Sequence, residues 1–228
     1  MSVPSSADLM TAIKSYLPST MKHNAGNTDT TPELTALLQD ICDEVTGEWS
    51  NWASSTKFGG VTVSGAGIGT WAGSGTGGNF NSIISMSIPH TYNTDATKKL
   101  EDKLSFRITA AFVQWSISFI FNGATYSGTS TATTNNPGTF TAQNTPVSLN
   151  SAGTVTKFGT LASDVFTDLA FQTGTIVMQL LNAIQSGLQS KFNAWRSAST
   201  VTGNSVSGTA VAGTGNGSGT SSIDGSIT

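Results

Sequence analysis

The residues best suited to chemistry are few in this chain, and their surroundings fit neither a metal site nor a nucleophilic site. His23 and His90 are the only histidines, and neither lies beside a cluster of acidic or cysteine residues that would complete a set of metal ligands. The single cysteine, Cys42, has no partner for an intrachain disulfide and forms no CxxC pair. It lies in an apolar helical stretch, where a small core residue is expected. The sequence therefore predicts no bound metal.

Carboxylates and glycine runs also lack the arrangement that an enzyme needs. A glycosidase requires two carboxylates that face each other across a cleft, but most carboxylates here fall on the polar faces of predicted helices: Asp43, Glu44, Glu48, Glu101, Asp102, Asp164 and Asp168. The runs GAGIGTWAGSGTGG and GTGNGSGT follow helices, whereas a dinucleotide site places its glycines before one, and no Gly-Lys pair serves a P-loop. With no GxSxG elbow either, we expect a noncatalytic protein without cofactors or small-molecule substrates.

Composition points to surfaces that other molecules cover. Charged residues make up 10% of the chain, against roughly 25% in ordinary soluble domains, so the polar surface must come mainly from Ser, Thr, Asn and Gly. Neutral hydroxyls and amides can be covered without the desolvation cost of a buried ion, although solvated flexible loops would have the same composition. The net charge of −3 and the absence of Lys/Arg runs disfavour binding to nucleic acid.

Neither a secretion signal nor a membrane-spanning segment is evident. The first residues lack a basic region followed by an apolar one. The longest largely apolar stretch, Ile108–Phe121, is shorter than the roughly 20 residues that span a bilayer, and it contains Gln, Ser and Thr. We expect a protein made in a cytoplasm, with no membrane partner.

The main pattern is a helix followed by glycine-rich strands, present three times. Trp115 lies 63 residues after Trp52, and Trp195 lies 143 residues after it. The apolar positions before Trp52 step by three and four residues, as one face of an α-helix does; they are Leu34, Leu37, Leu38, Ile41, Val45 and Trp49. All of them map onto apolar residues before Trp195, whereas the stretch before Trp115 has the polar exceptions Thr97 and Glu101. These faces predict a shared core that includes Trp52, Trp115, Trp195, Ile41, Leu104 and Ile184.

Glycines recur at matching positions after each tryptophan. The recurring residues are Gly60, Gly65, Gly123, Gly128, Gly203 and Gly208. Val, Thr, Tyr and Phe lie between them, which is typical of short strands joined by tight turns. We therefore predict a Gly-rich β-hairpin after each helix, with these glycines at its turns.

Together the patterns predict an α+β fold of three repeated units, each an amphipathic helix followed by a hairpin. The helices would pack into a shared core on one side with the hairpins on the other, and a linear array of units is the alternative. Thr31 with Pro32 would begin the first helix and Thr94 or Asp95 the second. The third would begin near Ser163 or Asp164, with a break at Gly174. The expected segments are an N-terminal segment with a helix at 1–31, repeats at 32–80, 95–140 and 163–220, a linker at 141–162 and a flexible tail at 213–228.

Two aromatic residues are candidates for an exposed contact. Trp71 has no aromatic counterpart at the aligned positions of the other two units, and Tyr126 lies in a predicted hairpin. Exposed aromatic rings on the hairpin faces would suit an alternative function, that of a secreted adhesin or carbohydrate-binding module.

The chain also resembles virion proteins of tailed bacteriophages. The resemblance rests on the low charge, the Ser/Thr/Gly/Asn-rich strands and the unit ends NWASSTKFGGVTVSG and AWRSASTVTGNSVSG, which are similar to small neck, tail and baseplate proteins. It covers the whole chain loosely and identifies no single family. It implies a noncatalytic structural protein of the virion, assembled in the host cytoplasm, whose partners are other virion proteins and copies of itself. In that role, hairpin edges and the tail would make intersubunit contacts, and the tail would order only on capture.

Overall fold

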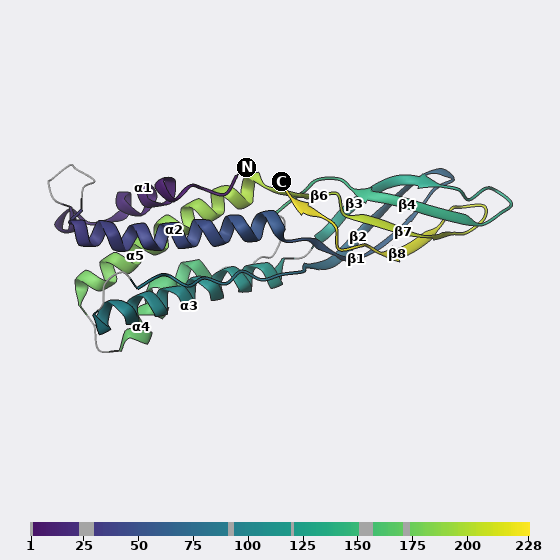
Figure 1. Cartoon of the computed structure of the whole chain (residues 1–228). Coiled ribbons are helices and arrows are strands. Elements are labelled where there is room, and N and C mark those ends of the chain that lie inside the picture. Colours follow the sequence, from purple (N-terminus) through teal and green to yellow (C-terminus); the bar gives the residue numbers. More distant parts are fainter. Residues whose placement is uncertain (1, 23–29, 91–93, 120, 151–156, 171–173) are drawn as a thin grey trace.

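The protein is a rod with helices at one end and a β-barrel at the other (Figure 1). The computed structural model describes residues 2–22, 30–90, 94–119, 121–150, 157–170 and 174–228. Both chain ends lie near the junction of the two halves, which we call the waist (Figure 1). The mixed helix and strand content predicted from the sequence is confirmed. The predicted placement of helices on one side and strands on the other becomes an end-to-end arrangement.

Three long helices form the bundle, and each has 24 residues: α2 (Pro32–Ser55), α3 (Asp95–Ser118) and α5 (Thr175–Ala198). The Thr31 side chain caps α2 by accepting a hydrogen bond from the Leu34 N–H, and Pro32 occupies the first turn. Thr94 caps α3 in the same way. Gly174 is the N-cap of α5 and gives it no side-chain bond, because glycine has no acceptor to offer.

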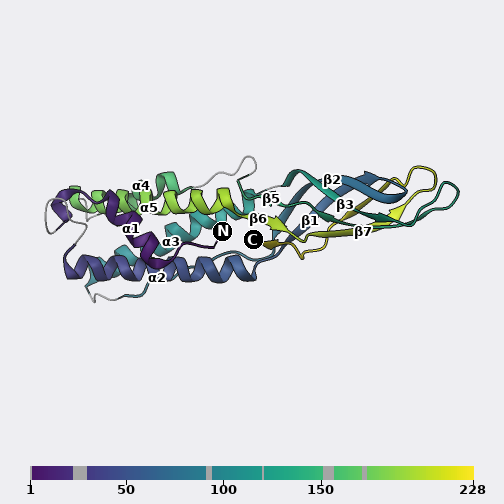
Figure 2. The same cartoon turned by 90° about the horizontal axis from the view of Figure 1, so that it is seen from above.

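Shorter elements fill the three grooves between the long helices. The helix α1 (Ser6–Tyr16) packs against α2 and α5, and α4 (Leu161–Leu169) packs against α3 and α5 (Figure 2). The extended segment 81–90 lies between α2 and α3, where the backbone N–H of Ser87 donates to Glu44 of α2 and that of Met86 donates to Thr109 of α3. Two 3-10 turns, η1 (Ser19–Met21) and η2 (Lys157–Thr160), complete this half. Each groove of the bundle therefore has its own filler.

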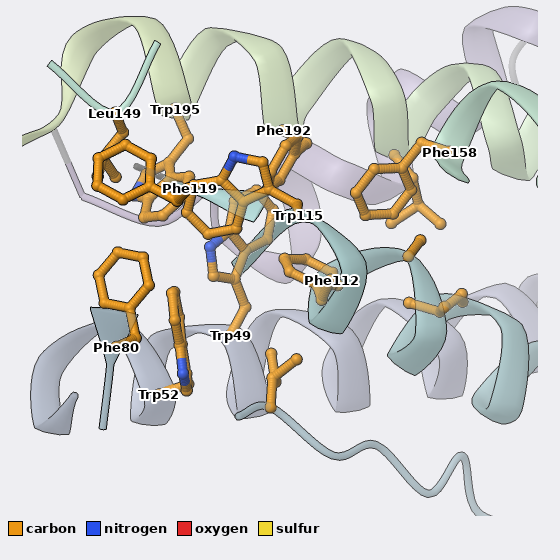
Figure 3. Close-up of a cluster of buried hydrophobic side chains, with 14 of the residues drawn as sticks. Trp49, Trp52, Phe80, Phe112, Trp115, Phe119, Leu149, Phe158, Phe192 and Trp195 are labelled. Carbon is orange, nitrogen blue, oxygen red and sulfur yellow. The ribbon is translucent and has the colours of Figure 1, made fainter. Parts of the chain in front are cut away.

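Aromatic rings from all three long helices meet in the core of the bundle (Figure 3). Trp49, Phe112 and Phe192 form a closed triangle, with ring centroids 5.2, 5.7 and 5.4 Å apart. Next to it, Trp115 lies 5.9 Å from Trp52 and 5.7 Å from Trp195. The six residues predicted to line this core are all buried: Trp52, Trp115, Trp195, Ile41, Leu104 and Ile184. Edge-to-face pairs such as Trp49 with Phe112 add roughly 0.5–1.5 kcal/mol each beyond area burial.

The β-barrel consists of antiparallel strands in the order β1-β2-β3-β4-β7-β8, closed by pairing of β8 with β1. Their bounds are β1 (Phe58–Ala66), β2 (Gly69–Phe80), β3 (Phe121–Ser130), β4 (Gly138–Asn144), β7 (Ser205–Ala210) and β8 (Gly217–Thr220). A small second sheet at the waist joins β5 (Val147–Ser148), β6 (Thr200–Thr202) and β9 (Ser226–Ile227). Each long helix thus leads into strands of the barrel, and the chain end returns to close it.

Apolar packing continues without a break from the bundle through the waist. Phe80 lies 5.2 Å from Trp52 of the bundle and 5.3 Å from Phe119, and Phe58 lies 4.2 Å from Phe121 at the base of the barrel. These buried residues belong to one hydrophobic cluster that includes both halves. The waist is consequently a packed joint, which stiffens the rod.

The barrel interior is filled by a stacked aromatic pair, which corrects the prediction of exposed contacts. Trp71 stacks on Phe140 at 4.2 Å with an interplanar angle of 9°, and both Trp71 and Tyr126 are only 1% exposed. Glycines make room for the pair, since a Cβ at Gly65 would lie 2.6 Å from the Trp71 ring and one at Gly208 would lie 2.7 Å from the Phe140 ring. The aromatic partner of Trp71 comes from a different strand, so aligning the units could not reveal it.

The recurring glycines do not form the hairpin turns, which corrects their predicted role. Gly60, Gly123 and Gly203 have φ values of 73°, 69° and 75° and lie where the chain passes from the waist into the barrel strands. The other three lie within strands: Gly65, Gly128 and Gly208. At Gly128 a Cβ would collide with the Thr141 backbone carbonyl of the neighbouring strand. Close approach of strands, rather than turning, requires glycine there.

The tail predicted to be flexible and part of the predicted linker are both built into the fold. Within 213–228 lie β8 and β9, and the backbone groups of Gly225 and Phe58 hydrogen-bond to each other in both directions. The Ser221 hydroxyl accepts a hydrogen bond from the Val61 N–H. The linker 141–162 contains the end of β4, then β5, all of η2 and the first two residues of α4, while residues 151–156 lie outside the described residues. Backbone pairing, which composition does not report, orders both segments.

Deleting residues 213–228 should open the barrel, because β8 closes it and β9 anchors the chain end at the waist. We expect amides of β1 and β7 to lose protection in hydrogen exchange followed by mass spectrometry, while α5 keeps most of its protection. The outward-facing substitution Ser218→Ala in β8 is the control and should leave protection unchanged. Undiminished protection of β1 in the deletion variant would contradict this role of the tail.

Candidate assembly surface

The outer face of the barrel is covered by small hydroxyl side chains, which we call the hydroxyl belt. Because side chains alternate between the two faces of a strand, the residues between the buried ones all point outward. The belt consists of Thr62, Ser64, Thr70, Ser74, Thr76, Thr125, Ser127, Thr129, Thr139, Thr141, Ser207, Thr209, Ser218 and Thr220, all of them exposed. Alternation of Ser or Thr with Val, Ala, Phe or Gly in the strand sequences is the signal that could have located it.

Strand register places these hydroxyls side by side in rows around the barrel. Thr129 pairs with Thr141, and Thr141 pairs with Ser207 on the next strand. On the other side of the barrel, Ser64 pairs with both Ser74 and Ser218. Neighbouring strands are about 4.8 Å apart, so the rows form a closely spaced array of hydrogen-bonding groups.

Charge is absent from this surface. None of the six barrel strands contains Asp, Glu, Lys or Arg. At the base of the barrel, Lys57 donates to the Ser226 hydroxyl at 2.6 Å, and Asp224 accepts from the Ser205 N–H at 2.9 Å. The remaining charged residues that the structure describes belong to the helical half or to the segments beside it. The rod therefore has one charged half and one uncharged half.

A shallow groove of about 380 Å³ crosses the outer face of β3, β4 and β7. Ser127, Thr129, Thr141 and Ser207 of the belt line it, together with Gln143. All aromatic side chains of the six strands are buried, either in the barrel or at the waist. The groove can therefore offer hydrogen bonds but no ring on which a sugar would stack.

Three hairpin ends are tied together at the tip of the barrel. The Gly67 N–H donates to the Thr214 carbonyl at 3.2 Å, and the Gly213 N–H donates to the Thr133 carbonyl at 3.0 Å. These bonds link the β1–β2, β7–β8 and β3–β4 connections into one cap. Ile68 and Val211 are exposed on this cap, so the tip is uncharged and partly apolar.

A buried amide network fixes the chain end at the base of the barrel. Asn204 is fully buried; its amide oxygen accepts from the Tyr126 hydroxyl at 2.5 Å, and its NH₂ group donates to the Phe58 and Ser222 carbonyls. Burial raises the pKa of Tyr126 to about 12, so its hydroxyl stays protonated and available as a donor. The network joins β1, β3 and the C-terminal segment, and it holds the belt in position.

Two pairs of titratable side chains lie in direct contact in the part of the bundle that the structure describes. Arg107 binds Asp168 with two hydrogen bonds of 2.7 and 2.8 Å, which link α3 to α4. His90 lies 2.9 Å from Asp102 on an exposed face, whereas His23 lies outside the described residues. No group of three potential metal ligands occurs among the described residues, and none of the described helices is long and apolar enough to cross a membrane.

Glu101 is the chemical exception, and it corrects the prediction of a solvated carboxylate. Its side chain is fully buried in α3, and neither carboxylate oxygen has a hydrogen-bond partner. Burial raises the pKa of Glu101; His90 opposes this shift, and Asp40 of α2 and Asp102 add to it. Leucine occupies the aligned positions of the other two long helices, Leu38 and Leu181. Ionisation of this carboxyl works against the packing of the bundle.

Replacing Glu101 by Leu should stabilise the protein by about 1–3 kcal/mol near pH 7, because an unpartnered buried polar group is removed. The raised pKa means that the folded state binds this proton more tightly than the unfolded state does. Protonation of Glu101 therefore contributes its full stabilisation below the pKa of the carboxyl in the unfolded chain, which is about 4.3. This contribution is lost as the pH rises through the pKa of Glu101 in the folded protein. Denaturant unfolding should thus show a gap between variant and wild type that is smallest at pH 4 and widens toward pH 7.

Glu101→Gln serves as the matched variant, since it keeps a polar group but cannot ionise. The stability of this variant should not show the decrease with rising pH that ionisation of Glu101 causes in the wild type. Parallel curves of stability against pH for the wild type and Glu101→Leu would show that the carboxyl does not titrate as burial requires.

Comparison with known proteins assigns no relative to this chain. No protein-family model matches it, and neither a curated protein nor a solved structure gives a match. Function must therefore be argued from the residues and their geometry.

Proposed function

We propose that this protein is a noncatalytic structural component of a viral particle, a neck, tail or baseplate protein of a tailed bacteriophage. Its uncharged barrel would contact other virion proteins and further copies of itself. The hydroxyl belt carries the proposal, because a barrel with no charged residue on any of its six strands suits a surface that neighbours cover.

Covering the belt costs little free energy. A buried unpaired charge costs several kcal/mol even after relaxation, whereas a hydroxyl needs only a hydrogen-bond partner or a bridging water. Short Ser and Thr side chains also lose less rotamer freedom than Lys or Glu on being covered. The hydroxyl belt can thus pack closely against a flat neighbouring protein at many positions.

Contacts in this role would be made by side chains rather than by strand addition. Exposed hairpin edges are the expected route from the sequence, but β1 pairs with β8 and the barrel has no free edge between them. Closure of a barrel removes the unpaired backbone groups that a partner strand needs. The proposal therefore rests on the belt and the tip, not on β-augmentation.

We further propose that the chain consists of three copies of one unit, a long helix followed by two barrel strands. The bounds of α2, α3 and α5 coincide when shifted by 63 and 143 residues, as do the three glycines of positive φ. The aromatic triangle takes one ring from the same aligned position of each helix. Repeated units on one rod would present similar surfaces to a symmetric partner at several places.

The alternative function, a secreted adhesin or carbohydrate-binding module, loses the residues on which it rested. Trp71 and Tyr126 point into the barrel, where they pack against Phe140 and bond to Asn204. The outer groove is lined mainly by hydroxyl side chains and by no aromatic ring. We therefore do not favour this reading.

If the three units are equivalent, replacing the positive-φ glycine of each unit should lower the free energy of unfolding by a similar amount. Gly60→Ala, Gly123→Ala and Gly203→Ala should each destabilise by about 1–2 kcal/mol, because alanine is strained at positive φ. Gly47→Ala, in the middle of α2 with open space around it, is the control and should stabilise by about 0.5–1 kcal/mol. Chemical denaturation measures all four. A negligible cost at one of the three glycines would argue against equivalent backbone roles.

The virion role is tested by mass spectrometry of density-gradient-purified particles from cultures that carry the gene. We expect the chain to be present in them, and we expect Thr129→Lys to lower its incorporation by about tenfold or more, because a lysine would be covered without a partner. Thr129 is exposed, so the free protein should keep its stability within about 0.5 kcal/mol. Ser190→Lys, exposed on α5, is the control. Absence of the chain from particles, or equal incorporation of Thr129→Lys, would refute the proposal.

A further inference from the structure

The outer face of α3 carries an apolar stripe that no other described helix or strand covers, and the Arg107 guanidinium of the same helix lies 5.4 Å from the Phe106 ring centroid. It consists of Phe106, Ala110, Val113 and Ile117, and the two large ends are 60% and 68% exposed. Steps of four, three and four residues place all four side chains on one line, with the spacing of a helix-pairing seam. The segment 81–90 and α4 pack on other sides of α3, through Thr109 and Arg107 respectively.

The other long helices show that this face does not need to be apolar. At the aligned positions, α2 has Asp43, Gly47, Ser50 and Ser54, and α5 has Ser186, Ser190, Asn193 and Ser197. These eight residues are polar or lack a side chain, and nearly all of them are exposed. The stripe on α3 is therefore a local departure, in a chain that otherwise makes this helical face polar.

We propose that the stripe is a self-association site, at which the α3 helices of two copies of this chain pack antiparallel. Phe106 of each copy would lie against Ile117 of the other, and Ala110 of each against Val113 of the other. From Phe106 to Ile117 the side chains of the stripe are large, small, intermediate and large. This order of sizes is nearly the same in either direction along the helix. Such self-complementarity is what a two-fold contact requires, because both copies use the same patch.

Charge selects the antiparallel direction. Continued toward the start of α3, the seam runs through Lys103 and Lys99. Parallel pairing would bring each lysine against the same lysine of the other copy, and the two positive charges would repel each other. Antiparallel pairing instead carries Lys103 past Ser118, the last residue of the other α3, where the free carbonyl groups of the helix end hold partial negative charge.

The size of the stripe sets the strength of the contact. Its 12 residues form a strip about 17 Å long, and with a helix diameter of about 10 Å the area of this strip is well below the roughly 800 Å² per partner that stable interfaces bury. We expect a reversible dimer with a dissociation constant of roughly 1–100 µM. Within a particle, where copies are held close together, such a contact is strengthened by effective concentration. This inference names one partner and one surface for the assembly role, and in that sense it rests on the proposed function.

Sedimentation equilibrium of the full chain across this concentration range tests the pairing. The variant Phe106→Ser with Ile117→Ser, which copies residues found at the aligned positions of α5, should weaken dimerisation by about 100-fold, because each copy loses two buried apolar side chains. Ile176→Ser is the control: Ile176 is an equally exposed isoleucine at the start of α5, outside the stripe, and its removal should change nothing. A wild-type chain that stays monomeric, or a dimer that the double variant leaves intact, would overturn the proposal.

Cysteine crosslinking tests the direction of pairing. A chain with Phe106→Cys mixed with a chain with Ile117→Cys should give a mixed disulfide dimer in preference to either homodimer. Cys42 does not interfere, because it is fully buried and burial raises its pKa to about 12. Homodimers crosslinked through position 106 alone would indicate parallel packing and refute the antiparallel arrangement.

The outcomes separate this inference from the virion role. A monomeric chain that is nevertheless present in purified particles would refute the pairing and leave the virion role intact. A chain that dimerises through α3 but is absent from particles would do the reverse.

Discussion

The packing of aromatic rings between the three long helices is the interaction on which the rest of the structure depends. Trp49, Phe112 and Phe192 each contact the other two, so no helix can be withdrawn without exposing rings on both of its neighbours. The adjoining layer, through Trp115 and the rings at the waist, extends this packing to the base of the barrel. Because the strands begin within a few residues of the helix ends, the helices fix where each pair of strands enters the barrel. The position of the hydroxyl belt is thus set from within the bundle.

Closure of the barrel is the second constraint, and it brings together strands that lie far apart in the sequence. The strand β8 pairs with β1, which precedes it by about 155 residues, and Asn204 bonds to the carbonyl groups of Phe58 and Ser222. Long-range pairing of this kind is costly in loop entropy and forms late unless the ends are already held together. In the folded chain, the packed helices hold the bases of these strands close together. The uncharged surface is therefore a product of the whole chain rather than of one hairpin.

Sequence periodicity predicted the helices well and the barrel poorly, for a physical reason. The apolar steps before each tryptophan reflect local geometry, and Thr31 and Thr94 begin two of the long helices as predicted. The third long helix begins after Gly174, the predicted break, and the predicted start near Ser163 or Asp164 belongs to the separate helix α4. The burial of Trp71 depends on Phe140, which lies in the distant strand β4, and no spacing within one segment reports such a contact. The glycine-rich tail looked flexible because its composition resembles a linker, yet small residues are what close strand packing requires. Glu101 was visible as the one charged exception in an apolar pattern, although its burial became clear only in three dimensions.

Because charge is unevenly distributed along the rod, contacts made by its two halves should depend differently on ionic strength. Ion pairs such as Arg107 with Asp168 weaken as ionic strength rises, because mobile ions screen them. Hydroxyl contacts on the barrel carry no net charge and are nearly indifferent to that screening. Contacts through the barrel half would thus persist from low to high ionic strength, while any contact of the helical half that uses charge would loosen.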